Sequence, residues 1–62
     1  MSDYIYCKTF PEDYLKIGAY TNVIELEIHT SEVEPVTIDL SSNKVDELID
    51  ILTNLKEEIK DD

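Results

Sequence analysis

The segment LKIGAYTNVIELEI, residues 15–28, decides the fold of this chain. Thr21 and Asn22 interrupt an alternation of apolar and polar residues, and they can form a two-residue turn in which Asn22 tolerates a left-handed conformation. This turn sets the flanking residues in antiparallel register, with the apolar residues on one face. The pairs on that face are Ala19–Ile24, Ile17–Leu26 and Leu15–Ile28. A shift of one residue would scatter these pairs, so the segment predicts a β-hairpin.

The opposite face of this hairpin collects charged and aromatic residues. The same register pairs Tyr14 with His29, Lys16 with Glu27, Gly18 with Glu25 and Tyr20 with Val23. The pair Lys16–Glu27 joins opposite charges across the strands, which stabilises a sheet. Gly18 is the only glycine of the chain, and within a strand it predicts a bulge or the close approach of another group.

Two further strands are predicted, one before and one after the hairpin. Apolar and polar residues alternate over residues 36–40, and Pro35 removes an amide only at the start of that strand, where the loss is tolerated. Residues 4–10 have the β-branched and aromatic content of a strand. The facing of this strand is ambiguous, because both of its alternating sets contain apolar or aromatic residues. Residues 11–13, Pro-Glu-Asp, predict the turn that follows it.

The pattern changes to a period of 3.6 residues after Ser41, which predicts a helix over about residues 42–60. We expect the Ser41 hydroxyl to cap the first turn by accepting a hydrogen bond from a backbone amide. Leu40 and Val45 have the spacing of a hydrophobic staple. One face of the helix carries the apolar residues Val45, Leu48, Ile49, Leu52, Leu55 and Ile59.

These elements predict an α+β fold, with a small antiparallel β-sheet of three to four strands in a meander and one C-terminal amphipathic helix packed on one face. The chain forms a single β-β-β-β-α domain over residues 1–62. A chain of this size buries only about 60% of its unfolded surface, and an internal disulfide is excluded because Cys7 is the only cysteine. We therefore expect a homodimer. Ile51 widens the apolar stripe, so Leu48, Ile51 and Leu55 are the expected dimer interface.

The charge balance restricts the classes of partner. Acidic residues number 15 against 5 basic ones, which gives a formal net charge of −10. Contacts with phosphates need Lys and Arg, so direct nucleic-acid binding and docking on an anionic membrane are not expected. The charge favours a protein partner with a basic surface, although acidity also serves solubility alone. A single thiol and the absence of a signal peptide predict a cytoplasmic location.

Catalysis, metals and cofactors have no motif in this sequence. Glu25 and Glu27 are the neatest carboxylate pair, but an open sheet face offers no pocket to separate their pKa values. His29 is expected to be a strand-face residue beside Tyr14, and Cys7 a small buried apolar residue. Two soft ligands are too few for a structural zinc site. We expect no enzyme activity, no metal and no cofactor.

The residues that favour partner binding lie on the polar face of the hairpin. They are Tyr14, Tyr20, Glu25 and Glu27. Tyrosines anchor protein interfaces, and carboxylates can stand in for phosphates. The leading hypothesis is therefore a small acidic inhibitor or modulator that occludes a basic, nucleic-acid-binding site on another protein. Phage and plasmid anti-defence proteins share this small size and acidity, in which case the location is the host cytoplasm. The alternative is a homodimeric structural or regulatory subunit with no inhibitory role.

Overall fold

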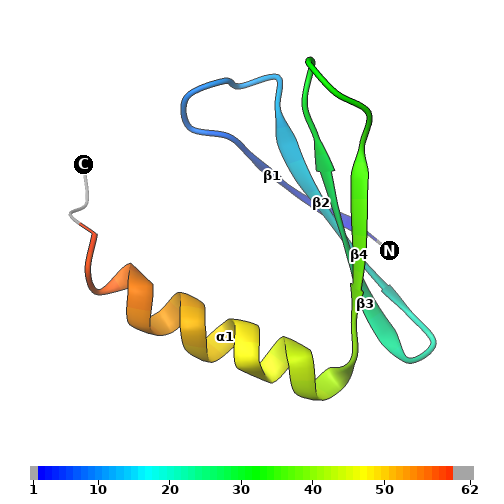
Figure 1. Cartoon of the computed structure of the whole chain (residues 1–62), viewed down its shortest axis with the longest axis vertical. Helices are drawn as coiled ribbons and strands as arrows, with labels where there is room; N and C mark the ends of the chain where they lie inside the picture. Colours follow the sequence, from blue (N-terminus) through cyan, green and yellow to red (C-terminus); the bar gives the residue numbers. More distant parts are fainter. Residues whose placement is uncertain (1, 60–62) are drawn as a thin grey trace.

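The computed structural model describes residues 2–59 and contains a four-stranded antiparallel sheet followed by one helix (Figure 1). The elements are β1 (Ser2–Tyr6), β2 (Tyr14–Tyr20), β3 (Val23–His29), β4 (Val36–Leu40) and α1 (Ser42–Lys56). The strands lie in the sheet in their chain order, β1-β2-β3-β4, which makes the sheet a meander. The predicted α+β fold with a C-terminal helix on the sheet is confirmed.

The pairing of β2 with β3 follows the register predicted from residues 15–28. Ile17 lies opposite Leu26 and Lys16 lies opposite Glu27, with Thr21 and Asn22 forming the turn between the strands. The expectation that Asn22 adopts a left-handed conformation is wrong, because Asn22, like every other described residue, has a negative φ. Gly18 has no positive φ either; instead, a Cβ placed on it would lie 3.3 Å from the Ser2 hydroxyl oxygen. The glycine therefore serves a close approach of β1.

The register assigns every strand residue to one of two faces of the sheet. The inner face carries Asp3 and Ile5 from β1, Leu15, Ile17 and Ala19 from β2, Ile24, Leu26 and Ile28 from β3, and Val36, Ile38 and Leu40 from β4. The outer face carries Ser2, Tyr4 and Tyr6, then Tyr14, Lys16, Gly18 and Tyr20, then Val23, Glu25, Glu27 and His29, and finally Thr37 and Asp39. Asp3 is the single charged residue of the inner face, so the two faces differ strongly in polarity.

The first strand differs from the prediction in its bounds. It spans Ser2–Tyr6 rather than residues 4–10, because the turn around residues 11–13 needs the intervening backbone. The Cys7 amide donates to the Asp13 carbonyl over 2.9 Å, and the Asp13 amide donates to the Phe10 carbonyl over 2.8 Å. The expectation that Cys7 is buried is also wrong, because it follows the last strand residue and is exposed.

The helix begins as predicted but ends earlier, at Lys56 rather than near residue 60. Glu57 and Glu58 follow, and carboxylates are unfavourable at the negative end of a helix dipole. Ser41 stands at the N-cap with extended backbone, and its carbonyl accepts from the Val45 amide over 2.9 Å. Its side chain makes no capping hydrogen bond, contrary to the prediction. Ser41 is exposed, so water can reach the first-turn amides in its place.

Packing between the helix and the sheet is confined to one end. α1 contacts β3 and β4, and Val45 and Leu48 are its only half-buried residues. Beyond them the helix diverges from the sheet (Figure 1). No apolar side chain among residues 2–59 is buried. The radius of gyration is 13.0 Å, against about 10.6 Å for a compact domain of this length, so the single chain has an open shape.

The Ser41→Ala substitution tests this description of the helix start. A hydroxyl that caps a helix contributes typically about 1 kcal/mol to stability, but the Ser41 hydroxyl makes no such bond. We expect the free energy of unfolding to fall by less than about 0.5 kcal/mol, as for an ordinary surface change. Urea denaturation followed by circular dichroism measures the difference. A loss near the full capping value would show that the hydroxyl caps the helix in solution.

Candidate protein-binding surface

A row of aromatic rings lies on the outer face at the end of the sheet where β2 begins. The Tyr14 ring has its centroid 5.6 Å from those of Tyr4 and Tyr6, both tilted against it. On its other side Tyr14 stacks on the His29 imidazole, with centroids 4.5 Å apart and an interplanar angle of 9°. The row follows from the register, because Tyr6 lies opposite Tyr14 and Tyr14 opposite His29. Four rings from three strands therefore form one surface, here called the aromatic row.

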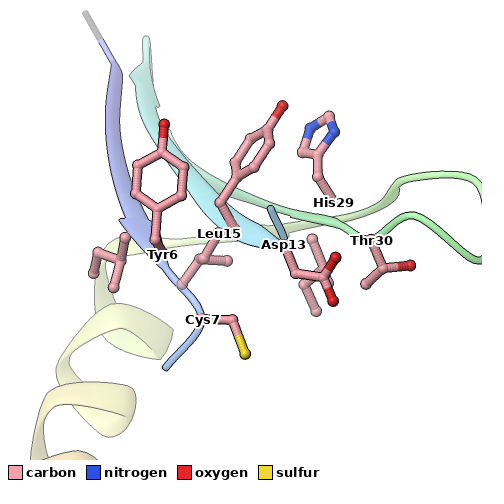
Figure 2. A pocket seen from close by; sticks show the side chains of 9 residues that line it. Tyr6, Cys7, Asp13, Leu15, His29 and Thr30 are labelled. Atoms are coloured by element: carbon pink, nitrogen blue, oxygen red, sulfur yellow. The ribbon is translucent and has the colours of Figure 1, made fainter. Parts of the chain in front are cut away.

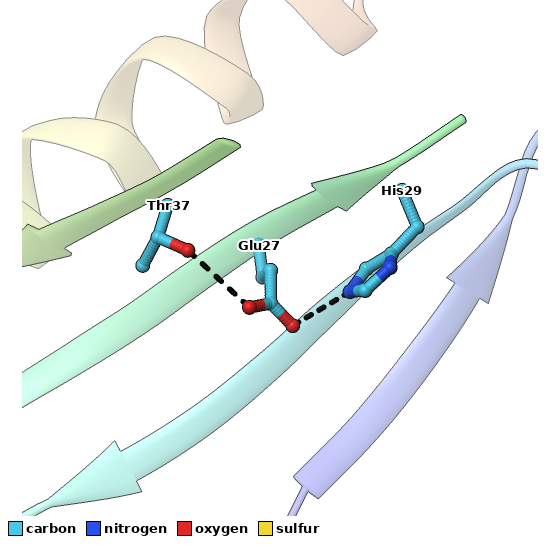
Figure 3. A network of polar contacts seen from close by, with 3 residues as sticks. All are labelled: Glu27, His29 and Thr37. Atoms are coloured by element: carbon cyan, nitrogen blue, oxygen red, sulfur yellow. Dashed lines mark hydrogen bonds and ion pairs between the residues drawn. The ribbon is translucent and has the colours of Figure 1, made fainter. Parts of the chain in front are cut away.

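A chain of hydrogen bonds continues the aromatic row across β3 to β4 (Figure 3). His29 Nε2 lies 2.6 Å from Glu27 Oε1, and since a carboxylate only accepts, Nε2 carries the proton. The Thr37 hydroxyl donates to Glu27 Oε2 over 3.3 Å. The hydrogen bond from His29 is the main reason that the pKa of Glu27 lies below its ordinary value; the charges of His29 and Lys16 and the Thr37 bond add to this, while desolvation opposes it.

Two carboxylates face one another beside this chain of hydrogen bonds. Glu25 on β3 lies directly opposite Asp39 on β4, and both belong to the outer face. Like charges placed directly opposite in a sheet are destabilising. A cation bound from outside would relieve that repulsion. The outer face thus combines ring surfaces with carboxylates, and both groups attract Arg and Lys side chains.

A shallow hollow of about 340 Å³ lies at the same end of the sheet (Figure 2). Among the residues that line it, Tyr6 and His29 point to one side of the sheet and Cys7 to the other (Figure 2). The Cys7 sulfur accepts a hydrogen bond from the Phe10 amide over 3.4 Å, and its thiol lies across the sheet from the imidazole. The His29 imidazole is therefore not placed to act as a base for the Cys7 thiol, which nucleophilic catalysis by this pair would require.

The structure brings together some of the residues predicted for partner binding and separates one of them. Tyr14 and Glu27 both contact His29, and Glu25 lies two residues from Glu27 on the same strand face. Tyr20 is exposed at the other end of β2, about 20 Å along the strand from Tyr14. Tyr20 is thus on the predicted face but outside the aromatic row.

Tyr4 and Tyr6 also belong to this surface. The sequence leaves the facing of their strand ambiguous, with either tyrosine able to extend the outer face, and the pairing of Tyr4 with Lys16 places both there. Asp39 is a further member that was not among the predicted binding residues, although its alternation with Ile38 predicts that it points outward.

The predicted dimer-interface residues lie on the helix and differ in exposure. Leu48 is half-buried near the sheet of its own chain, whereas Ile51 and Leu55 are exposed. These two therefore remain available to a partner, and their role in a dimer stays a prediction.

Residues 2–59 contain no group of three or more His, Cys, Asp or Glu side chains arranged to hold a metal ion. The helix in this range has neither the length nor the apolar character needed to cross a membrane. Comparison with protein-family models, curated proteins and solved structures finds no match.

The pKa of Glu27 provides a direct test of the hydrogen-bond chain. The His29→Phe substitution keeps a ring to stack on Tyr14 but removes the N–H donor. We expect it to raise the Glu27 pKa toward the ordinary glutamate value of about 4.3, because the hydrogen bond that contributes most to the lowering is lost. The matched Thr37→Val substitution should raise it less. NMR titration of the side-chain carboxyl measures both, and an unchanged pKa in His29→Phe would contradict the arrangement.

Proposed function

We propose that this protein acts by binding another protein through its outer face, and that the partner's contacting surface is basic. The observation that carries the proposal is the juxtaposition of the aromatic row with Glu25, Glu27 and Asp39 on one uncovered sheet face. Aromatic rings bind Arg and Lys through cation–π contacts, and carboxylates bind the same side chains through charge-assisted hydrogen bonds. Both act together on a partner that presents several such residues.

The net charge of the chain also supports a basic partner. A net charge of −10 on 62 residues attracts a basic partner over long range and raises its association rate, with a strong dependence on salt. The carboxylates then act at short range as substitutes for phosphates. The mechanism is occlusion, in which the bound protein denies the basic site to its nucleic acid. An anti-defence protein of a phage or mobile element, acting in the host cytoplasm, is the biological setting that this mechanism fits.

A second function has its own supporting observation. The inner face and the apolar stripe of α1 are largely uncovered in the single chain, which favours a homodimeric structural or regulatory subunit. In that case the acidity of the outer face serves solubility. The two functions differ in what they predict for partner binding, because a subunit of this kind has no need of the Glu25–Asp39 carboxylates.

Competition with nucleic acid tests the occlusion mechanism. The protein is immobilised and presented with purified nucleic-acid-binding proteins, each with and without its own oligonucleotide. We expect retention at low salt, release by a salt gradient, and displacement by the oligonucleotide, since both ligands would occupy one basic site. Retention that the oligonucleotide leaves unchanged would argue against occlusion. Failure to retain any basic protein would favour the structural subunit.

The Glu25→Lys substitution separates stability from function on this surface. The new lysine lies opposite Asp39, so a repulsive pair becomes an attractive one, and we expect the free energy of unfolding to rise by roughly 0.2–1 kcal/mol. Binding to the basic partner should weaken, with association about tenfold slower at low salt. Urea denaturation and surface plasmon resonance measure the two effects.

The matched control is Glu57→Lys, which makes the same change of net charge just beyond the end of α1. This variant should bind nearly as the unaltered protein does. Equal loss in both variants would mean that net charge alone drives binding, with no localised site on the outer face.

A further inference from the structure

The inner face of the sheet is apolar and largely uncovered. Ile5, Ile28, Val36 and Ile38 are 52–60% exposed, although the register places all four among the apolar residues of this face. The helix touches the sheet near Val45 and Leu48 alone. Monomeric proteins rarely leave a contiguous apolar patch of this kind open, and those that do use it as an interface.

The apolar stripe of α1 is equally uncovered. Ile49, Ile51, Leu52 and Leu55 are 50–55% exposed. The stripe continues from Val45 and Leu48, which are half-buried where α1 contacts the sheet, so its period turns the exposed part toward the same side. Ser41 joins the sheet to the helix, and beyond it α1 runs away from the sheet (Figure 1). The exposed apolar residues of the inner face and of α1 are here together called the wedge.

The surface area of the chain shows how much a partner must cover. A folded monomer of 7.2 kDa exposes about 4,100 Å², whereas this chain exposes 5486 Å². The excess is therefore roughly 1,400 Å². If two chains each bury that area against one another, the total lies within the range of about 2,000–5,000 Å² typical of obligate homodimers.

The charges of the chain permit a second copy against the wedge. Asp3 is the only charged residue that the register places on the inner face, and the apolar stripe of α1 is uncharged over Val45–Leu55. The other carboxylates of the strands lie on the outer face, and those of α1 lie on the side of the helix away from the stripe. Two copies can therefore bring their wedges together without burying unpaired charges, which would be costly.

We propose that two copies of this chain interlock, with the α1 helix of each copy lying against the wedge of the other. The partner's helix then covers the part of the inner face around Ile28 and Ile38 that the chain's own helix leaves open. Ile51 and Leu55 become buried between the chains, which extends their predicted role in a dimer. The contact is isologous, as in most homodimers, and it goes beyond the proposed function because it uses the opposite face.

The occupant is a second copy rather than the chain's own helix because of the connection between β4 and α1. Ser41 is the only residue between the two elements. Its carbonyl accepts from Val45, and Val45 and Leu48 already rest near the sheet. Laying the far half of α1 on the chain's own inner face would require different backbone dihedrals at Leu40 and Ser41 and a new packing of Val45 and Leu48 on the sheet. A helix of about 22 Å from a partner meets no such restriction.

Mixed isotope labelling distinguishes the two occupants directly. A sample is prepared from methyl-labelled and unlabelled chains, and nuclear Overhauser contacts between different chains are selected. We expect interchain contacts between the Ile28 and Ile38 methyl groups and those of Leu52 and Leu55. Finding these contacts only within one chain would overturn the proposal, and so would a protein that sediments as a monomer at millimolar concentration.

Leu55→Asp tests the interface by substitution, with the neighbouring Asn54→Asp as its control. Both add one negative charge, but Leu55 lies on the apolar stripe and Asn54 on the opposite side of the helix. We expect the dimer dissociation constant to rise about 30-fold or more for Leu55→Asp and less than about threefold for Asn54→Asp. Sedimentation equilibrium measures both values. Equal effects of the two variants would overturn the proposal.

Two measurements on the unaltered protein keep the proposal testable even if Leu55→Asp fails to fold. The unfolding midpoint should rise with protein concentration, because folding and association are coupled. Added salt should strengthen the dimer by screening repulsion between two acidic chains, whereas it weakens binding of a basic partner to the outer face. A midpoint independent of concentration, or a dimer weakened by salt, would overturn the interlocked arrangement without affecting the proposed function.

Discussion

The antiparallel register between β2 and β3 determines on which face of the sheet each side chain lies. With Ile17 opposite Leu26, the aliphatic residues of β2 and β3 lie on the inner face. Lys16, Glu27 and the residues that alternate with the aliphatic ones lie on the outer face. β1 and β4 add to the two edges of this hairpin and continue the same division. A one-residue slip would exchange the faces. The aromatic row and the wedge both depend on this single register.

The single helix is too short to cover the apolar inner face of the sheet. A helix of 15 residues that touches the sheet only through its first turns cannot cover an inner face built from four strands. The chain is therefore left with an apolar surface on one side and an acidic, aromatic surface on the other. The two respond to salt in opposite directions. Screening reduces the repulsion between two acidic chains that associate through their apolar faces, whereas it weakens the attraction between unlike charges at the outer face. Association of two copies through the inner face would therefore not compete with binding of a basic partner through the outer face.

The sequence was most informative where several signals agreed. The hairpin register could be predicted residue by residue, because alternation, charge pairing and the turn all selected one alignment. β1 was harder, since Tyr4 and Ile5 are both plausible core residues and only the pairing with Lys16 and Leu15 decides between them. Periodicity could not predict where the helix ends or that the Ser41 hydroxyl makes no capping bond, because both depend on local hydrogen bonds. The extent of uncovered apolar surface could not be predicted at all, because the angle at which α1 leaves the sheet is a tertiary property.

The geometry of an interlocked dimer restricts how the outer faces can act. If the inner faces of two copies lie toward one another, the outer faces point in opposite directions. One dimer then cannot place both acidic faces on adjacent basic sites of one rigid partner, so it gains no avidity from a single partner molecule. It can instead hold two partner molecules apart, each covered over its own basic site. If the protein acts by occlusion, this arrangement therefore requires one partner molecule per chain. The affinity of each outer face for its partner is then independent of the other.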